Sequence, residues 1–387
     1  MFLLRRATVE VVKGAPVTLF LCGDVMTGRG VDQILPHPND PTLQEAHVED
    51  ARTYVELVEA VNGRIPRPVD FSWPWGDVLP TLDDIAPDVR VINLETSVTQ
   101  SEEFAPAKAL HYRMHPHNLP CLAAGRPDAC VLANNHVLDF GSQGLQDTLD
   151  ALSDAGLRAV GAGRDASEAR QPAAVDVEGD RQVAIFSCGM ASSGIPPSWA
   201  ATPDQPGINF VRDLSRSSAS ELTGWVRAMT RPGDVVVVSV HWGSNWGYNV
   251  LPDQIRFAHD LIDGGVDVVH GHSSHHPRPI EMYRDKLILY GCGDLINDYE
   301  GITGYEQYRS DLRLLYFPSV EPDTGRLVSL RIIPMQARKM RLHRASLADS
   351  EWLRAVLDHV SLDFGSRVYL ASDGILAVCD RAGRCRT

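Results

Sequence analysis

The chain has 387 residues, of which 44% are hydrophobic and 22% charged, a composition that excludes a disordered or collagen-like protein. Fifty acidic against 36 basic residues give a formal net charge of −14, which disfavours nucleic acid or an anionic membrane as the partner. No run of about 18 apolar residues is present, so no transmembrane helix or membrane anchor is predicted.

The first residues do not fit a secretory signal. In Met1–Arg6 the two arginines follow the apolar residues, and no long apolar stretch or cleavage site comes after them. The seven cysteines are scattered without a Cys-x-x-Cys pair, and most lie in strand-like apolar runs, which is typical of reduced core thiols. We therefore expect a cytoplasmic protein that would bind any metal through other ligands.

Short β-branched runs alternate with amphipathic stretches, which predicts an α/β fold with a mixed or parallel sheet at its centre. Buried strands are predicted at Val17–Cys22, Val89–Leu94, Cys130–Ala133, Val183–Cys188, Val235–His241, Val266–His270 and Lys286–Tyr290. Helices are predicted at Leu43–Val61, Gly144–Ala155, Leu214–Met229 and Pro252–Gly264. Two antiparallel strands and a last helix follow, at Leu312–Phe317, Leu327–Pro334 and Leu347–Val360. No repeat or linker divides the chain, so one domain over 1–387 is expected, with its core at about 17–300 and C-terminal strands and a helix in 301–387.

Residues that can bind a metal follow several of the predicted strands. The acids, the amide and His136 come after the first three strands, and the other histidines come at or just after the ends of the next ones: Asp24, Glu95, Asn135, His136, His241, His270, His272, His275 and His276. The carboxyl ends of strands in an open α/β sheet form a common crevice, so these side chains are expected to meet. Their mixed nitrogen and oxygen donors suit a divalent ion, and a carboxylate can bridge two such ions. The sequence does not distinguish Mn, Fe, Zn, Ca or Mg.

Five ordered blocks between about Val17 and Asn297 carry a family resemblance: Gly-Asp, Asn-x-Glu, Asn-His, His-Trp-Gly and Gly-His-x-x-His. Together they resemble the capsule-biosynthesis CapA family, a branch of the calcineurin-like metallophosphatases. The resemblance implies the calcineurin-like metallophosphatase fold, a four-layer α/β/β/α sandwich with a two-metal site at the strand ends. It assigns one metal to Asp24, Glu95 and His275, and the other to Glu95, Asn135, His241 and His272, with Glu95 bridging the two.

Further roles are implied by the same resemblance. His136 would be the acid/base residue, and Arg29 would clamp an anion or carboxylate of the substrate. His276 and His270 compete with His275 for its place, the alternative for each being a hydrogen bond to a ligand residue. Asp294 stands where the family commonly has Asn and is predicted to be a second acid/base residue.

The aromatic cluster beside His241 has two interpretations. Trp242 and Trp246 form either a wall on the substrate side of the site or part of the core, and we expect the wall. Met26 stands where the wider phosphatases have a ligating His, so one metal has a ligand fewer than in those enzymes.

Two reactions fit these residues, and the favoured one acts on a peptide substrate. The favoured one is metal-assisted Cα epimerisation of a residue in a ribosomal precursor peptide of the lasso type, since capsule members carry an N-terminal anchor that is not predicted here. The alternative is a binuclear metallohydrolase of a phosphoester or a γ-glutamyl amide. A non-catalytic scaffold is disfavoured by the retained ligand set. The oligomeric state is left open.

Overall fold

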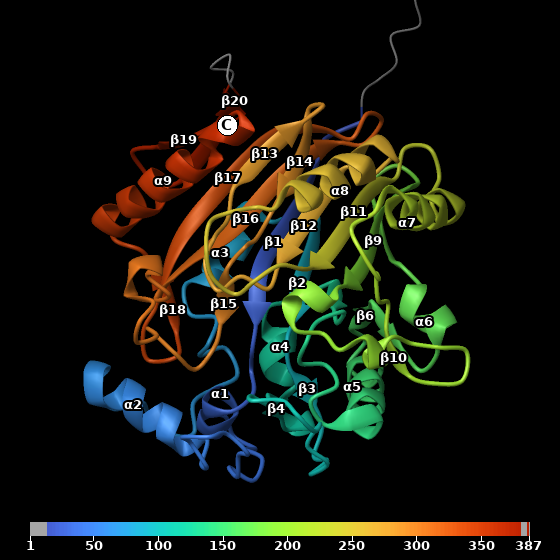
Figure 1. Ribbon diagram of the computed structural model, residues 1–387. Helices are drawn as coiled ribbons and strands as arrows, with labels where there is room; N and C mark the ends of the chain where they lie inside the picture. The colour runs from blue at the N-terminus through green and yellow to red at the C-terminus, as the bar shows by residue number, and fades with distance from the viewer. Residues whose placement is uncertain (1–13, 381–384, 387) are drawn as a thin grey trace, which may run out of the picture.

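The computed structural model describes residues 14–380 and 385–386, so the prediction for Met1–Arg6 lies outside the described residues. Two large sheets dominate this part of the chain, and Figure 1 shows their strands in the middle of the molecule with helices around them. The arrangement is a mixed α/β fold, as the alternation of runs predicts.

The larger sheet has eleven strands. Its main path runs in the order β19 (Ser366–Leu370), β20 (Leu376–Asp380), β17 (Arg326–Ala337), β16 (Leu312–Glu321), β1 (Val17–Val25), β2 (Val89–Leu94), β5 (Ala129–Val131), β6 (Arg158–Val160). Three short strands join its sides: β15 (Asp294–Ile296), β18 (Leu342–Arg344) and β21 (Cys385–Arg386). The centre, β1 with β2, β5 and β6, is parallel, whereas β16 and β17 pair antiparallel.

The second sheet has six strands, in the order β13 (Ile280–Tyr283), β14 (Lys286–Leu289), β12 (Val268–His272), β11 (Val235–His241), β9 (Arg181–Gly189), β8 (Ala173–Val177). Its central strands β9, β11, β12 and β14 are parallel. Two further sheets have two short strands each: β3 (Ser97–Val98) pairs with β4 (Arg113–Met114), and β7 (Ala162–Gly163) pairs with β10 (Gly207–Ile208).

Nine α-helices are assigned in the described residues: α1 (Gly30–Ile34), α2 (Arg52–Asn62), α3 (Val78–Ile85), α4 (Pro120–Ala124), α5 (Gly141–Asp154), α6 (Ala166–Arg170), α7 (Arg216–Met229), α8 (Pro252–Asp263) and α9 (Leu347–Ser361). None of them is both long and apolar enough to cross a membrane.

The apolar core follows from the two-residue period of the strands. On β1, Leu19 and Leu21 belong to a cluster that also contains Val237 of the second sheet. The residue between them, Phe20, belongs to a different cluster with side chains of α2 to α5. A third cluster joins the second sheet to α7 and α8. The two sheets therefore share one core, and helices pack against their other faces.

Most predicted strands and helices are confirmed, two of them, Val89–Leu94 and Val235–His241, to the residue. The predicted helix Leu43–Val61 starts too early, because the chain before Arg52 closes a loop through bonds such as that from Leu43 N to Glu49 O, 2.9 Å. The strand expected at Val266–His270 is β12, which starts later and runs through His272. The expectation of reduced thiols is wrong for Cys379, which is disulfide-bonded, and five other cysteines are free and buried.

Candidate metal centre and active site

Carboxylates lie close together at the end of β1 because its two parallel neighbours, β2 and β15, run alongside it there. In register, Asp24 lies beside Asn93 of β2 and Asp294 of β15. Gly23 permits this approach: a Cβ at this position would lie 1.6 Å from the carbonyl oxygen of Gly293. The glycine of the Gly-Asp block is therefore required for a steric reason, since any larger residue at position 23 would push β15 and its Asp294 away.

Asn93 joins Asp24 to Glu95, which directly follows β2. Its Nδ2 donates to Asp24 Oδ1 at 2.8 Å and lies 3.1 Å from Glu95 Oε2. Asp24 Oδ2 is buried without a hydrogen-bond partner. A buried carboxylate oxygen without a partner is costly unless a cation faces it. This oxygen therefore marks the place where a cation fits.

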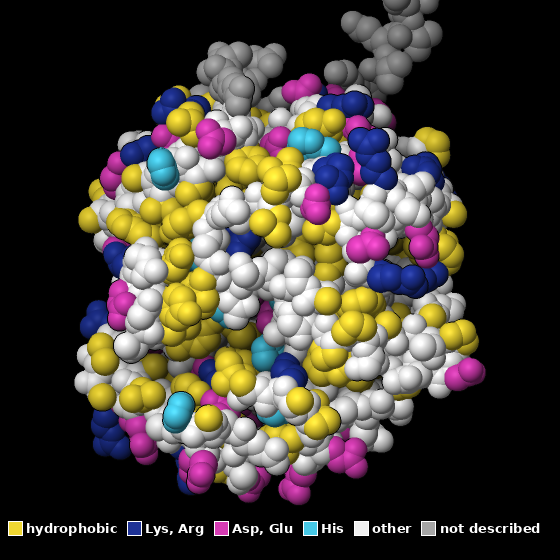
Figure 2. All heavy atoms as spheres, viewed as in Figure 1, with side chains coloured by type: hydrophobic (Ala, Val, Ile, Leu, Met, Phe, Trp, Pro, Cys, Tyr) yellow, Lys and Arg dark blue, Asp and Glu magenta, His cyan; other side chains and the backbone are white. Residues whose placement is uncertain are grey.

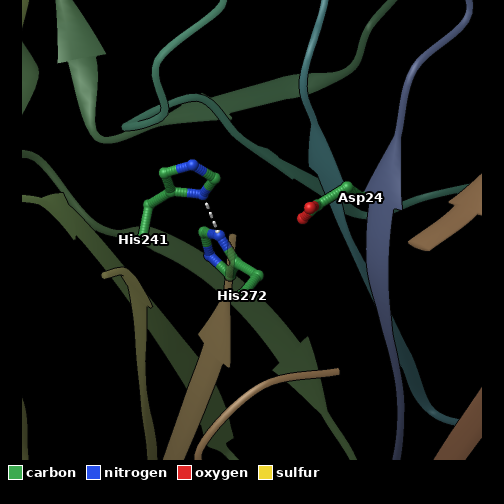
Figure 3. A group of neighbouring side chains, drawn as sticks. All are labelled: Asp24, His241 and His272. Atoms are coloured by element: carbon green, nitrogen blue, oxygen red, sulfur yellow. Dashed lines mark hydrogen bonds between the residues drawn. The ribbon is translucent and has the colours of Figure 1, made fainter. Parts of the chain in front are cut away.

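Two imidazoles face Asp24 from the second sheet. His241 and His272 end β11 and β12 side by side in register, with their Nδ1 atoms 2.6 Å apart. Figure 3 shows the carboxylate of Asp24 pointing toward this pair from β1. Ser239 Oγ lies 2.8 Å from His272 Nε2, and Asn135 Oδ1 lies 2.8 Å from His241 Nε2. Burial lowers the pKa of both histidines well below the usual value, so both are neutral, as ligation requires.

A second group lies on the other side of Asp24. His275 Nδ1 is 2.9 Å from Asp294 Oδ1, and Asp294 Oδ2 accepts bonds from Tyr299 and Asn297 at 2.7 and 2.9 Å. One donor atom from each member of Asp24, His241 and His272, and likewise of Asp24, His275 and Asp294, falls within 4.8 Å of the others. Asp24 is thus common to both groups, whereas the resemblance assigns the bridging position between the two metals to Glu95.

The electrostatics fit divalent cations. Burial, reinforced by the charge of Asp294, raises the pKa of Asp24 to about 7. Burial and the adjacent Asp24 raise the pKa of Glu95 well above its usual value. Two buried carboxylates that repel each other in this way are stabilised by a cation between them, and the mixed nitrogen and oxygen donors suit a transition metal.

His136 is held in one orientation by a buried acid. Its Nδ1 lies 2.7 Å from Asp139 Oδ2. Burial alone would raise the pKa of Asp139, but its contacts with His136 and with the ammonium group of Lys108 hold that pKa low, so Asp139 accepts and the proton is on Nδ1. Lys108 Nζ pairs with the other oxygen of Asp139 at 2.5 Å. Burial lowers the pKa of His136 to about 4, so its Nε2, 3.8 Å from Glu95 Oε1, is a free base.

A cavity of about 920 Å³ opens onto these groups. Glu95, Asn135, His136 and His275 are among its lining residues, together with Lys108, Trp246 and Tyr299. Figure 2 shows a hollow in the middle of the molecule, flanked by hydrophobic side chains, with histidine and a basic side chain inside it. The volume is that of a site for a small-molecule or peptide ligand.

The structure brings together all six predicted ligands, Asp24, Glu95, Asn135, His241, His272 and His275. Two other candidates, His276 and Asp294, have different surroundings from those expected. His276 is not in either metal group; its ring packs on those of Trp246 and Tyr308. Asp294 does not line the cavity, and its oxygens are engaged by the neighbours described above.

Arg29 lines the cavity, but its guanidinium already pairs with two acids. It lies 2.6 Å from Asp298 and 2.9 Å from Glu45, with its side chain 3% exposed. The backbone at Arg29 has φ 47°, a conformation that these ion pairs hold in place. Its role as a substrate clamp stays a prediction.

Trp242 is a core residue, which corrects its expected place in the substrate wall. It is 1% exposed, stacks on Tyr290 and donates from Nε1 to the Tyr290 carbonyl at 3.0 Å. Trp246, by contrast, lines the cavity. The physical reason is that side chains alternate at the strand end, so His241 and Trp242 point to opposite faces.

Two residues that hold His136 are not among the predicted site residues. Lys108 lies in the loop before β4, where no spacing relates it to His136. Asp139 anchors the imidazole of His136. Its signal was the interval of three residues from His136, which a single turn brings into contact.

Replacing Trp242 with Ala should lower the free energy of unfolding by about 3–5 kcal/mol, because a large buried ring leaves a cavity. Trp246→Ala should cost less stability, since Trp246 is only partly buried. Urea denaturation of the two variants measures the difference. An equal loss in both, or none in Trp242→Ala, would contradict the assignment of Trp242 to the core.

Metal binding should release protons, and more at pH 6 than at pH 8. The raised pKa of Asp24, about 7, means that its carboxyl is largely protonated at pH 6 and must lose the proton to bind a cation. The affinity for Mn²⁺ should therefore fall as the pH falls below about 7. Calorimetry in two buffers with different ionisation enthalpies measures the release. Asp24→Asn is the matched control and should release fewer protons, whereas a release independent of pH would refute the assignment.

Comparison with known proteins supports a family relationship. The family model "Bacterial capsule synthesis protein PGA_cap" matches residues 18–299. A protein of Mycobacterium tuberculosis named a probable polyglutamine synthesis accessory protein is 55% identical over 367 residues, 95% of this chain and 97% of its own. The PGA biosynthesis protein CapA of Bacillus subtilis is 28% identical over 243 residues, 62% of this chain and 60% of its own. A solved structure from Thermus thermophilus covers 66% of this chain and 93% of its own, with 12% identity and a TM-score of 0.35, too slight a likeness to argue from.

Proposed function

The chain belongs to the family of bacterial capsule synthesis proteins matched over residues 18–299, and from this premise we propose that it is a divalent-metal-dependent hydrolase of an amide bond. The substrate would be a glutamyl or glutaminyl peptide chain, since its relatives are named for polyglutamine and PGA synthesis. The observation that carries the proposal is the unpartnered Asp24 Oδ2, buried opposite His241 and His272.

The fold proposed with this function is the four-layer sandwich of the calcineurin-like metallophosphatases, in one domain. Its support is the core that the two sheets share, together with the helices packed against their other faces. The metal groups at the ends of β1, β11 and β12 agree with the general rule that ligands bind at the carboxyl ends of strands.

Each residue has a distinct part in the proposed reaction. Asp24, His241 and His272 would hold one ion, and Asp24, His275 and Asp294 the other, with Glu95 and Asn135 beside them. Divalent ions bound there supply Lewis acidity and lower the pKa of water. His136 Nε2 accepts a proton from the attacking water and returns it to the departing amine nitrogen. Asp139 and Lys108 hold the ring so that Nε2 faces the cavity.

Cα epimerisation of a lasso-type precursor peptide is the second candidate that the residues suggested. It needs two acid/base groups that reach opposite faces of one Cα. His136 lines the cavity but Asp294 does not, and both Asp294 oxygens are bonded to His275, Tyr299 and Asn297. This arrangement favours hydrolysis, in which one acid/base residue is sufficient.

The experiment that separates the two reactions uses isotopic water. The Mn²⁺-loaded protein is incubated in H₂¹⁸O with α-linked oligoglutamine, α-linked oligoglutamate or γ-linked oligoglutamate, and the peptide masses are recorded. The proposal predicts shorter chains that carry ¹⁸O in the new carboxyl group. Intact chains with all three substrates would overturn it. Intact chains that gain one mass unit per reacting residue in D₂O would establish epimerisation instead.

A further inference from the structure

An apolar stripe on α2 runs from the edge of the core into the cavity. Tyr54, Leu57, Val58 and Val61 have the spacing i, i+3, i+4, i+7 that places side chains on one face of a helix, and all four line the cavity. Leu57 is 57% exposed and Val61 is 83% exposed. Large aliphatic side chains gathered in this way at a cavity mark a binding surface. Figure 1 shows α2 at the margin of the molecule, below β15 and β18.

Other aliphatic residues complete this wall, which we call the apolar subsite: Leu57, Val58, Val61, Leu110 and Ile302. Leu110 lies two residues after Lys108, and Ile302 lies three residues after Tyr299, so each segment contributes both to the subsite and to the metal side of the cavity. One continuous cavity therefore joins His136 to the apolar subsite. A ligand whose reacting bond lies at His136 can reach the subsite with the rest of its length.

Polar contacts hold α2 in place relative to the metal centre. Near its start, Tyr54 OH accepts from Arg29 at 3.1 Å, and the guanidinium lies over the Tyr54 ring at 3.9 Å. At its end, Asn62 Nδ2 donates to Glu300. Tyr299, next to Glu300, donates to Asp294 Oδ2 at 2.7 Å. The subsite is thus anchored at both ends of the helix to segments that also reach the metal centre.

The charges in the cavity disfavour a polyanion at this end. Among the described lining residues, the Lys and Arg side chains are Arg29 and Lys108, and both are already paired, with Asp298 and Asp139 respectively. Glu300 lines the cavity beside the subsite, and the chain as a whole has a net charge of −14. A run of free glutamate side chains along α2 would meet aliphatic groups and carboxylates, with no unpaired cation among the described lining residues to receive it.

We propose that the apolar subsite binds an aliphatic group of the substrate, such as an acyl chain, while the polar end of the substrate lies at the metal centre. The subsite narrows the substrate class to a glutamyl or glutaminyl amide that also carries an aliphatic substituent. This assignment rests on the proposed function for the reacting bond. The binding of the aliphatic group follows from the cavity alone.

The test measures binding of octanoate and butyrate to the Mn²⁺-loaded protein by calorimetry. Neither probe has an amide bond, so the result does not depend on turnover. Their carboxylates are alike, and octanoate has four more methylene groups to bury against α2. We expect octanoate to bind at least about tenfold more tightly than butyrate. Equal affinities would overturn the proposal.

Val61→Asp places a charge in the subsite at a position too exposed to affect folding. It should remove most of the preference for octanoate and leave the affinity for butyrate unchanged. Leu347→Asp on α9 is the matched control, because Leu347 is 64% exposed and does not line the cavity, and it should keep the preference. The proposal would be overturned if Val61→Asp kept the preference for octanoate. It would also be overturned if Val61→Asp changed the oligomeric state on size exclusion, since the stripe would then be a contact between copies of the chain.

The two proposals fail separately. A preference for octanoate that Val61→Asp removes, in a protein that cleaves none of the amide substrates, would support the subsite and reject the hydrolase. Cleavage of oligoglutamine by a protein without that preference would do the reverse.

Discussion

Replacing His241 with Ala is expected to reduce kcat for amide hydrolysis by roughly 10³-fold or more, together with a loss of bound metal. His241 lies at the centre of the site: its two ring nitrogens are 2.6 Å from His272 Nδ1 and 2.8 Å from Asn135 Oδ1. Its removal takes away one ligand and leaves a gap beside two others. Elemental analysis of the purified variant and its kcat, measured on the same sample, test both parts of the expectation.

His259→Ala is the matched control. His259 is on α8, where its Nε2 lies 3.0 Å from Glu281 and its ring stacks on Tyr283, outside the cavity and both metal groups. This variant should keep its metal and its kcat. If His241→Ala also kept both, the assignment of His241 as a metal ligand would be wrong.

The second large effect is expected at His136. Without its ring no group accepts the proton of the attacking water, so His136→Ala should lower kcat by about 10²–10⁴-fold and leave the metal content unchanged. Asp139→Asn should have a comparable effect, because an amide that donates to Nδ1 would favour the tautomer with its proton on Nε2. The double variant should be no slower than His136→Ala alone, since the two residues act as one unit.

Metal content separates this interpretation from ligation. If His136→Ala loses metal in proportion to activity, then His136 is a ligand and not the acid/base residue. Asp165→Asn serves as the matched control, because Asp165 caps α6 by accepting from Glu168 N at 2.8 Å and does not line the cavity. It should retain the kcat of the parent protein.

The strands and the candidate metal ligands could be predicted because their causes are local in the sequence. A β-branched run such as Val235–His241 is buried on both faces and forms a central strand wherever the sheet places it. Residues that follow such runs then meet at one end of the sheet. The same logic brings Asp24 to His241 and His272, although they come from strands far apart in the sequence.

The remaining features depend on loops and on the packing of separate segments. Lys108 and Asp298 reach the site from irregular segments whose course no periodicity encodes. The role of Asp294 depends on β15 lying against β1, which requires Gly23 and a contact between distant parts of the chain. The stripe of α2 that lines the cavity could not be predicted from the sequence, because its residues have the spacing of the buried face of an ordinary helix. Only the exposure of Leu57 and Val61 distinguishes it from such a helix.

Asp24 is the ligand that the two proposed metal sites share. A crystal of the protein grown with Mn²⁺ tests this assignment directly through anomalous scattering at a wavelength where manganese absorbs. We predict two peaks, one among Asp24, His241 and His272 and the other among Asp24, His275 and Asp294. Absence of a peak at Asp24, or manganese bound only elsewhere, would contradict the metal centre and the hydrolase proposed from it.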